Sequence, residues 1–298
     1  MAECITIDTN HLGRSGVIAC YLIKGSVPIL VDPGPAVVLP TIDASLSAHG
    51  LGLADIGAIL LTHIHLDHAG AVGSIVAAHP HITVYVHQRG APHLIDPSKL
   101  LNSATRIYGD MMATLWGDFL AIPESNLHLL HGGEHLHIGD QQFTVYDAPG
   151  HAVHHVMYQW NDTVFVGDNA GIRMQGFSYV RPATPPPDID LEALDRSLDL
   201  LRTRAPQRLC LTHFGSVTDV EAHLTRVHEA NWRWANLVKG WIDAGITPEE
   251  QVNRLRQHAT AEMGADATDA GIQAYQKGAS IEMSWQGLHR YWLKRQTS

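Results

Sequence analysis

Polar side chains of metal-binding type recur in this chain at the points where predicted strands end. Asp32, the segment 63–68, His151, Asp168 and His213 each follow a short apolar run of the kind that forms a buried strand. Loops that leave one end of a sheet converge, so these side chains are expected to meet although they are far apart in sequence. The pattern therefore predicts a mixed α and β fold whose strand ends build one polar centre.

Strands are predicted throughout the first two thirds of the chain. Apolar and β-branched runs predict them over 17–23, 29–31, 56–61, 82–86, 135–138, 142–146, 155–160, 163–166 and 208–211. The pairs Gly139–Asp140 and Asn161–Asp162 lie between neighbouring runs and predict two hairpins.

Helices are predicted between and after the strands. Helical spacing of apolar residues predicts them over 37–49, 69–79 and 191–201, whereas 88–126 mixes loop and helix patterns. From about residue 218 the pattern is helical, with starts predicted at Thr218 with Glu221 and at Thr247–Pro248 with Glu250. We therefore expect a catalytic domain over 1–217 and a helical extension over 218–298 packed on it.

Charge and composition indicate which classes of binding partner to expect. The chain has 30 acidic against 20 basic residues and a net charge of −10, which disfavours nucleic acid as a partner. No apolar stretch approaches the roughly 20 residues of a membrane span. The cysteines Cys4, Cys20 and Cys210 are few and far apart, and the first residues lack a signal-peptide pattern. These features predict a cytoplasmic protein that acts on a small molecule, without a membrane partner.

The run THIHLDHAG at residues 62–70 has the composition of a metal site. His63 and His65 are two residues apart, so in an extended segment they project from the same face. Asp67 and His68 follow after a turn, and three imidazoles with a carboxylate suit zinc, iron or manganese. The alternative is a polar loop in a chain with 21 histidines. We favour a metal site because the run follows an apolar strand.

THIHLDHAG is similar to the metal motif of the metallo-β-lactamase fold superfamily. DPGP at 32–35, APGHAVHH at 148–155, FVGDNAG at 165–171 and LTHFG at 211–215 follow in the order of that superfamily. The resemblance thus covers about residues 1–215. It implies an α+β fold, a four-layer αββα sandwich with two sheets back to back, to which this chain adds extra C-terminal helices.

Carried over residue by residue, the resemblance implies two metal sites. Their ligands are His63, His65 and His151 in one site, Asp67, His68 and His213 in the other, and Asp168 as the bridge. The expected cofactors are two divalent cations, zinc first, with iron or manganese as alternatives. A hydroxide held between two cations attacks an electrophilic carbonyl or phosphorus at neutral pH. Asp67, which could orient this nucleophile, and Asp168 are the expected catalytic residues.

Several other side chains are candidates around this centre. Asp32 is expected behind the site, where it would orient a ligand histidine, and the alternative is a simple turn residue. Tyr108, Arg173 and Tyr179 are candidates for substrate binding, against the alternative of ordinary exposed loops. The tryptophans after residue 230 are expected to pack the C-terminal helices and could form a homodimer face.

The sequence indicates the substrate class less clearly than it indicates the metal ligands. Drug-hydrolysing β-lactamases of this fold generally lack the bridging carboxylate, whereas this chain has Asp168 together with His68. The chain looks more like glyoxalase II and the lactonases, so we expect hydrolysis of a small ester, thioester or lactone. The alternatives are phosphodiesterase or weak β-lactamase activity at the same site. A protein that binds metal or a ligand without catalysis is an alternative of another class.

Overall fold

A computed structural model describes residues 3–278 and 280–296 of the chain. By proximity along and across the chain it forms two compact units. The first comprises Met1–Asp147 with His154–Gly167, and the second comprises Ala148–Val153 with Asp168–Ser298. The division expected near residue 217 stays a prediction. The strands belong to two sheets, and helices occupy the chain between and after them.

The first sheet lies wholly in the first unit. Its strands, in spatial order, are β1 (Glu3–Asp8), β2 (Ala19–Lys24), β3 (Ile29–Val31), β4 (Ala58–Leu60), β5 (Thr83–His87) and β6 (Leu127–Leu130). The pairs from β1 to β3 are antiparallel, and those from β3 to β6 are parallel. Every residue of β3 and β4 is buried, as expected for parallel strands that are covered on both faces. The polar loops that follow these two strands carry Asp32 and the 63–68 run.

The first unit also contains an antiparallel meander of four strands. These are β7 (His135–Ile138), β8 (Gln141–Asp147), β9 (Val156–Trp160) and β10 (Thr163–Gly167). Both predicted hairpins are confirmed, because β7 pairs with β8 and β9 pairs with β10. The meander faces the first sheet: the rings of Tyr21 and Phe165 are 5.3 Å apart, and the Tyr158 hydroxyl donates to the Leu61 carbonyl at 2.9 Å.

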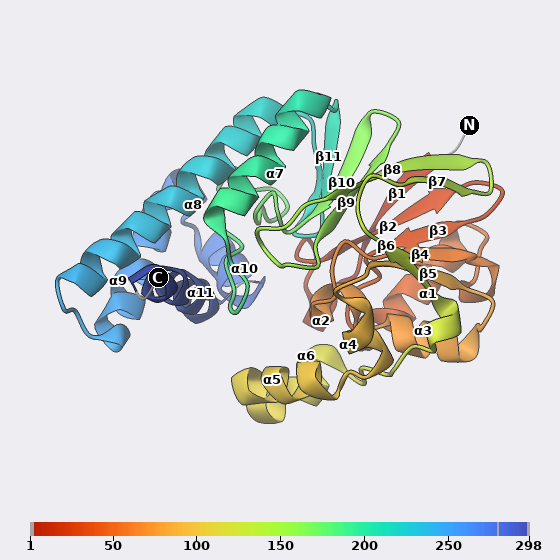
Figure 1. The fold of residues 1–298 in the computed structure, drawn as a ribbon, viewed down its shortest axis with the longest axis horizontal. Helices are drawn as coiled ribbons and strands as arrows, with labels where there is room; N and C mark the ends of the chain where they lie inside the picture. Colours follow the sequence, from red (N-terminus) through yellow and green to blue (C-terminus); the bar gives the residue numbers. More distant parts are fainter. Residues whose placement is uncertain (1–2, 279, 297–298) are drawn as a thin grey trace. The chain divides into compact units, whose positions relative to one another are not determined.

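Helices cover the first sheet (Figure 1). They are α1 (Leu39–Ala48), α2 (Leu66–Ala69), α3 (Val72–Ala78), α4 (Ala91–Ile95), α5 (Ser98–Tyr108) and α6 (Met112–Trp116). Short 3-10 turns are η1 (His11–Gly13), η2 (Ala36–Val38), η3 (Leu53–Asp55), η4 (Gly109–Met111) and η5 (Glu124–Asn126). Ile42 and Leu46 of α1 and Ile75 of α3 join Leu30 and Ile59 of the strands in one buried core. Segment 88–126 thus contains three short helices.

The second unit is mainly helical. It contains α7 (Leu191–Arg204), β11 (Arg208–Leu211), β12 (Gly215–Val217), α8 (Val220–Asp243), α9 (Pro248–Glu262), η6 (Gly264–Asp266), α10 (Asp269–Gly278) and α11 (Ile281–Gln296). The predicted start of α9 is confirmed, since the Thr247 side chain accepts from the Glu250 N–H. The predicted start at Thr218 is wrong. Helix α8 begins after Asp219, whose carboxylate pairs with Arg173 and Arg226.

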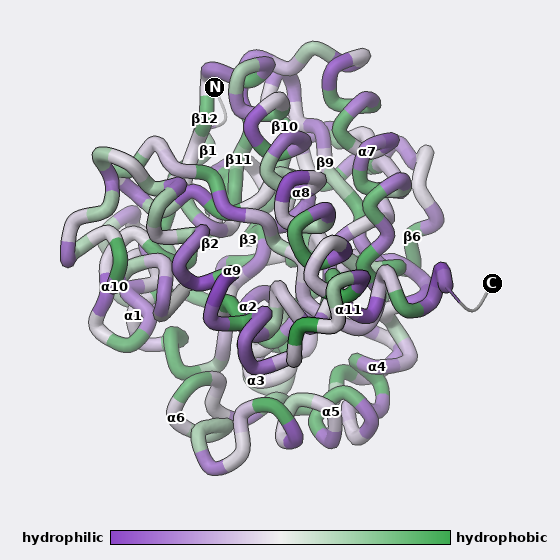
Figure 2. Tube along the Cα trace, turned by 90° about the vertical axis from the view of Figure 1, so that its left-hand side faces the viewer, coloured by the Kyte–Doolittle hydropathy of each residue, from purple (hydrophilic) through white to green (hydrophobic). Residues whose placement is uncertain are grey.

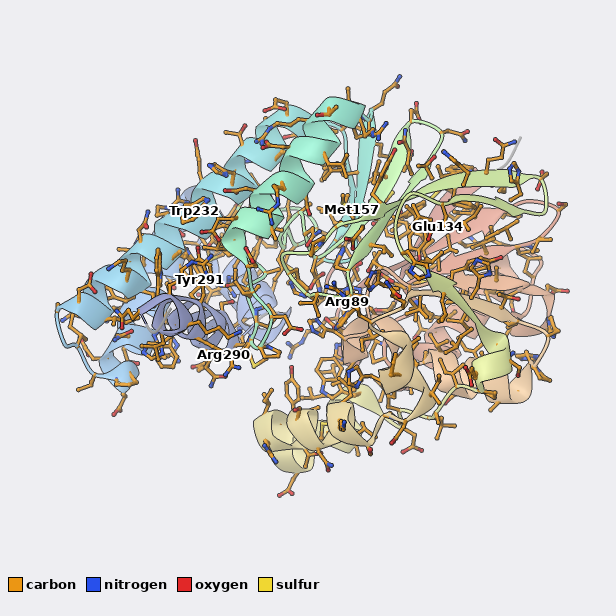
Figure 3. The ribbon with its side chains drawn as sticks, viewed as in Figure 1. Arg89, Glu134, Met157, Trp232, Arg290 and Tyr291 are labelled. Atoms are coloured by element: carbon orange, nitrogen blue, oxygen red, sulfur yellow. The ribbon has the colours of Figure 1, made fainter. Side chains whose placement is uncertain are left out.

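Aromatic side chains hold the C-terminal helices together. Trp234, Leu255, Leu288 and Tyr291 are buried in one cluster of the second unit. Trp232 of α8 donates through its indole N–H to Asp195 of α7 at 2.7 Å, so the two helices lie side by side (Figures 1 and 3). Among the helices that the structure describes, none combines the length and apolar character that crossing a membrane requires.

Gly287 of α11 lies directly against the backbone of the second unit. A Cβ at this position would be 2.0 Å from the Thr184 carbonyl oxygen. We expect Gly287→Ala to lower the free energy of unfolding by at least about 2 kcal/mol, since the backbone must move to admit a methyl group. Gly240→Ala is the matched control, because no atom lies within 4 Å of a Cβ there and alanine favours the helix. Urea unfolding of both variants tests this, and equal stabilities would contradict it.

Candidate metal centre

The segment after β4 places two histidines with their rings in contact. His63 is fully buried and His65 is half-buried, in the extended stretch before α2. The His63 Nε2 and His65 Nδ1 atoms are 2.9 Å apart. Two imidazole nitrogens at this distance can either form a hydrogen bond with each other or both coordinate one metal cation. The spacing that the sequence shows therefore gives a pair of nitrogen donors directed at one point.

A buried carboxylate fixes the orientation of His68. The Nδ1–H of His68 donates to Asp32 Oδ2 at 2.8 Å. Asp32 also accepts the Thr62 N–H at 2.8 Å and the Thr62 hydroxyl at 2.6 Å. A proton held on Nδ1 leaves the lone pair of His68 on Nε2, which is the atom 3.8 Å from Asp67 Oδ2. The structure thus places Asp32 behind His68, in the position of a residue that orients a ligand.

The second unit gathers the three remaining predicted ligands. The Nδ1–H of His151 donates to the Ala183 carbonyl at 2.8 Å, which leaves Nε2 with its lone pair. That Nε2 lies 3.6 Å from Asp168 Oδ2, and His213 Nε2 lies 3.6 Å from Asp168 Oδ1. The two carboxylate oxygens therefore face two different imidazoles. This is the arrangement that a carboxylate bridging two cations would need.

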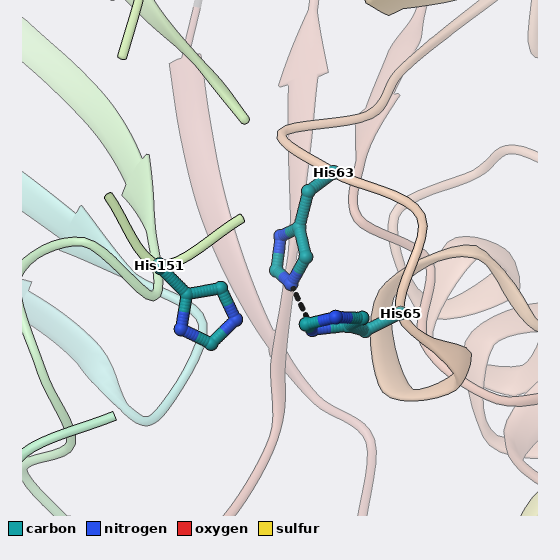
Figure 4. Close-up of side chains that lie close together, drawn as sticks. All are labelled: His63, His65 and His151. Atoms are coloured by element: carbon teal, nitrogen blue, oxygen red, sulfur yellow. Dashed lines mark hydrogen bonds between the residues drawn. The ribbon is translucent and has the colours of Figure 1, made fainter. Parts of the chain in front are cut away.

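Two groups of side chains are close enough to hold a cation. They are His63, His65 and His151 (Figure 4), and Asp67, His68, Asp168 and His213. Within each group the donor atoms lie within 4.8 Å of one another. The two groups contain the same seven residues that the resemblance assigned. Their nitrogen and carboxylate donors fit zinc, iron or manganese, and the bonds to Asp32 and Ala183 favour the tautomers that ligation requires.

Comparison with known proteins establishes the family. The model of the metallo-β-lactamase superfamily matches residues 13–213, which is more than half of the chain. The chain belongs to the metallo-β-lactamase superfamily. Members of this superfamily are metal-dependent hydrolases. Residues 1–12 and 214–298 lie outside the match.

Curated relatives in the superfamily match parts of the chain. A metallo-β-lactamase fold-containing protein, ST1585 of Sulfurisphaera tokodaii, is 29% identical over 57% of this chain and 65% of its own length. The hydroxyacylglutathione hydrolase of Halorhodospira halophila is 31% identical over 49% of this chain and 42% of its own length. The chain therefore spans less than two thirds of the length of these relatives.

Solved structures confirm the predicted fold class. A metallo-β-lactamase family protein from Thermus thermophilus, TTHA1429, aligns with 99% of this chain and 94% of its own, with a TM-score of 0.70 and 18% identity. The structure of ST1585 covers 75% of this chain and 85% of its own, with a TM-score of 0.61 and 24% identity. The chain has the α+β metallo-β-lactamase fold with extra C-terminal helices.

The three predicted substrate contacts lie in different surroundings in this metallo-β-lactamase fold. Tyr108 at the end of α5 is half-buried, and burial together with the charge of Asp67 raises the pKa of its phenol. Arg173 pairs with Asp219, and its backbone N–H donates to the His213 carbonyl at 2.5 Å. Tyr179 is 8% exposed and donates to Glu262 at 3.3 Å. Tyr108 is thus near Asp67, Arg173 is beside His213, and Tyr179 packs towards α9.

Two further histidines lie beside the first group. The His155 ring is 5.0 Å from the His63 ring, and the His154 ring is 5.8 Å from that of His65. Neither belongs to the two groups of candidate ligands.

The contact between His151 and the Ala183 carbonyl could not be predicted from the sequence. Every residue has a backbone carbonyl, so the residue type at position 183 does not indicate that it accepts from a histidine.

His223 of α8 supports the loop that follows Asp168. It is fully buried, and its Nε2–H donates to the Ala170 carbonyl at 2.9 Å. Burial lowers the pKa of His223 from 6.5 to about 4, so the folded protein holds it neutral while the unfolded chain takes up a proton below pH 6.5. Its contribution to stability is therefore present above pH 6.5 and is lost as the pH falls towards 4.

We expect His223→Gln to reduce this acid sensitivity. Between pH 7 and pH 4 the variant should lose about 3 kcal/mol less unfolding free energy than the parent protein. Urea unfolding with chelator present in both samples measures this, because the metal-ligand histidines then contribute equally. Parallel pH profiles would show that His223 is protonated without loss of stability.

Proposed function

We propose that this protein hydrolyses a small ester, thioester or lactone with two divalent cations bound by the seven residues named above. The observation that carries the proposal is the position of Asp168, whose Oδ2 faces His151 and whose Oδ1 faces His213, each at 3.6 Å. A carboxylate placed in this way can serve two cations at once. Zinc is the proposed metal, with iron or manganese as alternatives.

The roles of the side chains follow from their contacts. When bound, two divalent cations supply an activated water and polarise the substrate oxygen. Asp32 and the Ala183 carbonyl hold protons on the Nδ1 atoms of His68 and His151, which keeps the Nε2 atoms available as donors. Asp67, whose side chain is 22% exposed, orients the attacking water and accepts its proton. Tyr108 remains a neutral phenol and donates a hydrogen bond to the substrate.

The proposed substrate class has support from the relatives and from charge. The relative from Halorhodospira halophila is named a hydroxyacylglutathione hydrolase, which supports an acyl compound as the substrate proposed here. The net charge of −10 disfavours nucleic acids as partners. The domain boundary near residue 217, a homodimer through the C-terminal helices and a cytoplasmic location belong to the same proposal. Phosphodiesters and β-lactams are the competing substrates of the same site.

One preparation tests the proposal if metal and activity are measured together. Metal is quantified per chain, and turnover is measured on lactones, thioesters including glutathione thioesters, aryl esters, phosphodiesters and β-lactams. We expect about two metal equivalents, turnover on the carbonyl substrates, loss with a chelator and recovery with zinc. Bound metal without turnover on the whole panel would favour a binding protein. Metal well below one equivalent after zinc, iron and manganese are added would contradict the site itself.

A further inference from the structure

An apolar stripe runs along α5, η4 and α6 and extends beyond what the core covers. Ala104, Tyr108, Met112 and Trp116 recur every fourth residue and pack against the core of the first unit. Ile107 and Met111 lie one residue before two of these positions, and they are 46% and 51% exposed. Figure 2 shows hydrophobic stretches along α5 and α6. One edge of the stripe therefore faces solvent.

A third exposed apolar side chain is held beside α6. Leu12 in η1 is 44% exposed and has a left-handed backbone, with φ 55° and ψ 34°. The ring of the preceding His11 stacks on Trp116 at 5.7 Å, and its Nε2 is 2.7 Å from the Leu115 carbonyl. Leucine is uncommon in this backbone region, which asparagine adopts more easily. Folding alone does not favour a leucine here.

This apolar surface adjoins the segment that carries the candidate ligands. The Tyr108 ring is 5.2 Å from that of Trp116, and a Cβ on Gly34, just before η2, would be 3.7 Å from the Asp67 carbonyl oxygen. A second connection runs through η2, where a Cβ on Gly117 would be 3.2 Å from Val37 Cγ1. The residues just before η2 form a hydrogen bond with the 62–70 segment, because the Gly34 N–H donates to the His68 carbonyl at 3.1 Å.

We propose that Leu12, Ile107 and Met111 form a recognition surface for the apolar acyl chain of the substrate, next to Asp67. This inference deepens the proposed hydrolysis and rests on it. Water adds to the acyl carbon, the acyl–oxygen or acyl–sulfur bond breaks, and the leaving alcohol or thiol takes a proton. Three side chains expose far less than the roughly 800 Å² per partner that a stable protein interface buries, so a small ligand fits better than a second copy.

Chain-length series test the surface with two readouts. The first is kcat/KM for aryl acetate, butyrate and octanoate esters. The second is the affinity for acetate, butyrate and octanoate by calorimetry, which needs no turnover. In the parent protein we expect each added methylene to raise both quantities by about two- to fourfold.

Matched variants test two of the three side chains, Leu12 and Met111. Leu12→Asn relieves the backbone while removing the apolar group, and Met111→Gln keeps a side chain of similar length. The double variant should lose most of the dependence on chain length and keep its activity on the acetate ester. Leu129→Gln, at a 47% exposed leucine of β6, should behave like the parent protein.

Each result decides between the two proposals. Turnover that does not depend on chain length, or a dependence that the double variant retains, overturns the recognition surface and leaves hydrolysis standing. Binding that depends on chain length and is lost in the double variant, without turnover of any ester, thioester or lactone, supports the surface and overturns hydrolysis. If no binding is seen and no ester, thioester or lactone is turned over, both proposals fail. Self-association that the double variant abolishes would instead assign the surface to a second copy.

Discussion

Replacing Asp168 with alanine is expected to lower kcat/KM by on the order of a thousandfold or more and to reduce bound metal to about one equivalent or less. The reason is the position of its two oxygens, each 3.6 Å from the Nε2 atom of a different histidine. Asp168→Asn keeps the size of the side chain and removes its charge, and it should show a loss of the same order. Steady-state kinetics and metal analysis on the same samples measure both effects.

The neighbouring carboxylate Asp162 provides the control for this prediction. It lies in the turn between β9 and β10, is exposed and belongs to neither group of candidate ligands. Asp162→Ala should keep the parent rate and metal content. If Asp168→Ala also kept both, the bridging role would be refuted, together with the site that depends on it.

Asp32→Asn is expected to weaken metal binding about 10- to 100-fold, with a similar fall in kcat/KM at limiting metal. The carboxylate of Asp32 accepts hydrogen bonds from Thr62 on one side and from His68 Nδ1 on the other. A carboxamide of the same size must turn its NH₂ towards one of these donors, so His68 loses its fixed orientation. Asparagine also tolerates the left-handed backbone at this position, where φ is 46°, so folding should be preserved. Competition with a chelator of known affinity measures the change.

Thr62→Val tests whether the bond from Thr62 to Asp32 matters as much for metal binding as the bond from His68 to Asp32. It removes the hydroxyl, which donates to Asp32 at 2.6 Å and lies 3.1 Å from His63 Nδ1, and leaves the bond between Asp32 and His68 in place. We expect metal affinity to fall by much less than in Asp32→Asn. Equal losses in the two variants would show that local packing, rather than the carboxylate, holds His68.

The strands and the candidate ligands could be predicted because both leave clear local signals. β3 and β4 are short apolar runs buried along their whole length, and polar motifs follow them directly. The hairpin at Gly139–Asp140 was predictable for a related reason, since turn residues separate two runs of alternating burial.

Other elements could not be predicted because tertiary contacts determine them. β6 pairs with β5 although two of its four residues, His128 and Leu129, are exposed, so its sequence lacks a strand period. Helix α8 begins after Asp219 rather than at Thr218, and the Asp219 carboxylate pairs with Arg173, which is distant in sequence, and with Arg226, about two helical turns into α8. The choice between the two nitrogens of each histidine depends on partners that no spacing reveals.

His68 and His151 are oriented by different kinds of acceptor, a side-chain carboxylate and a main-chain carbonyl. Any residue at position 183 offers a carbonyl, so mutation there does not remove the acceptor that His151 uses. Asp32, in contrast, can be exchanged by a single codon change. The two orienting contacts therefore differ in evolvability: the contact behind His68 can be retuned or lost by one substitution, whereas the contact behind His151 is buffered by the backbone itself.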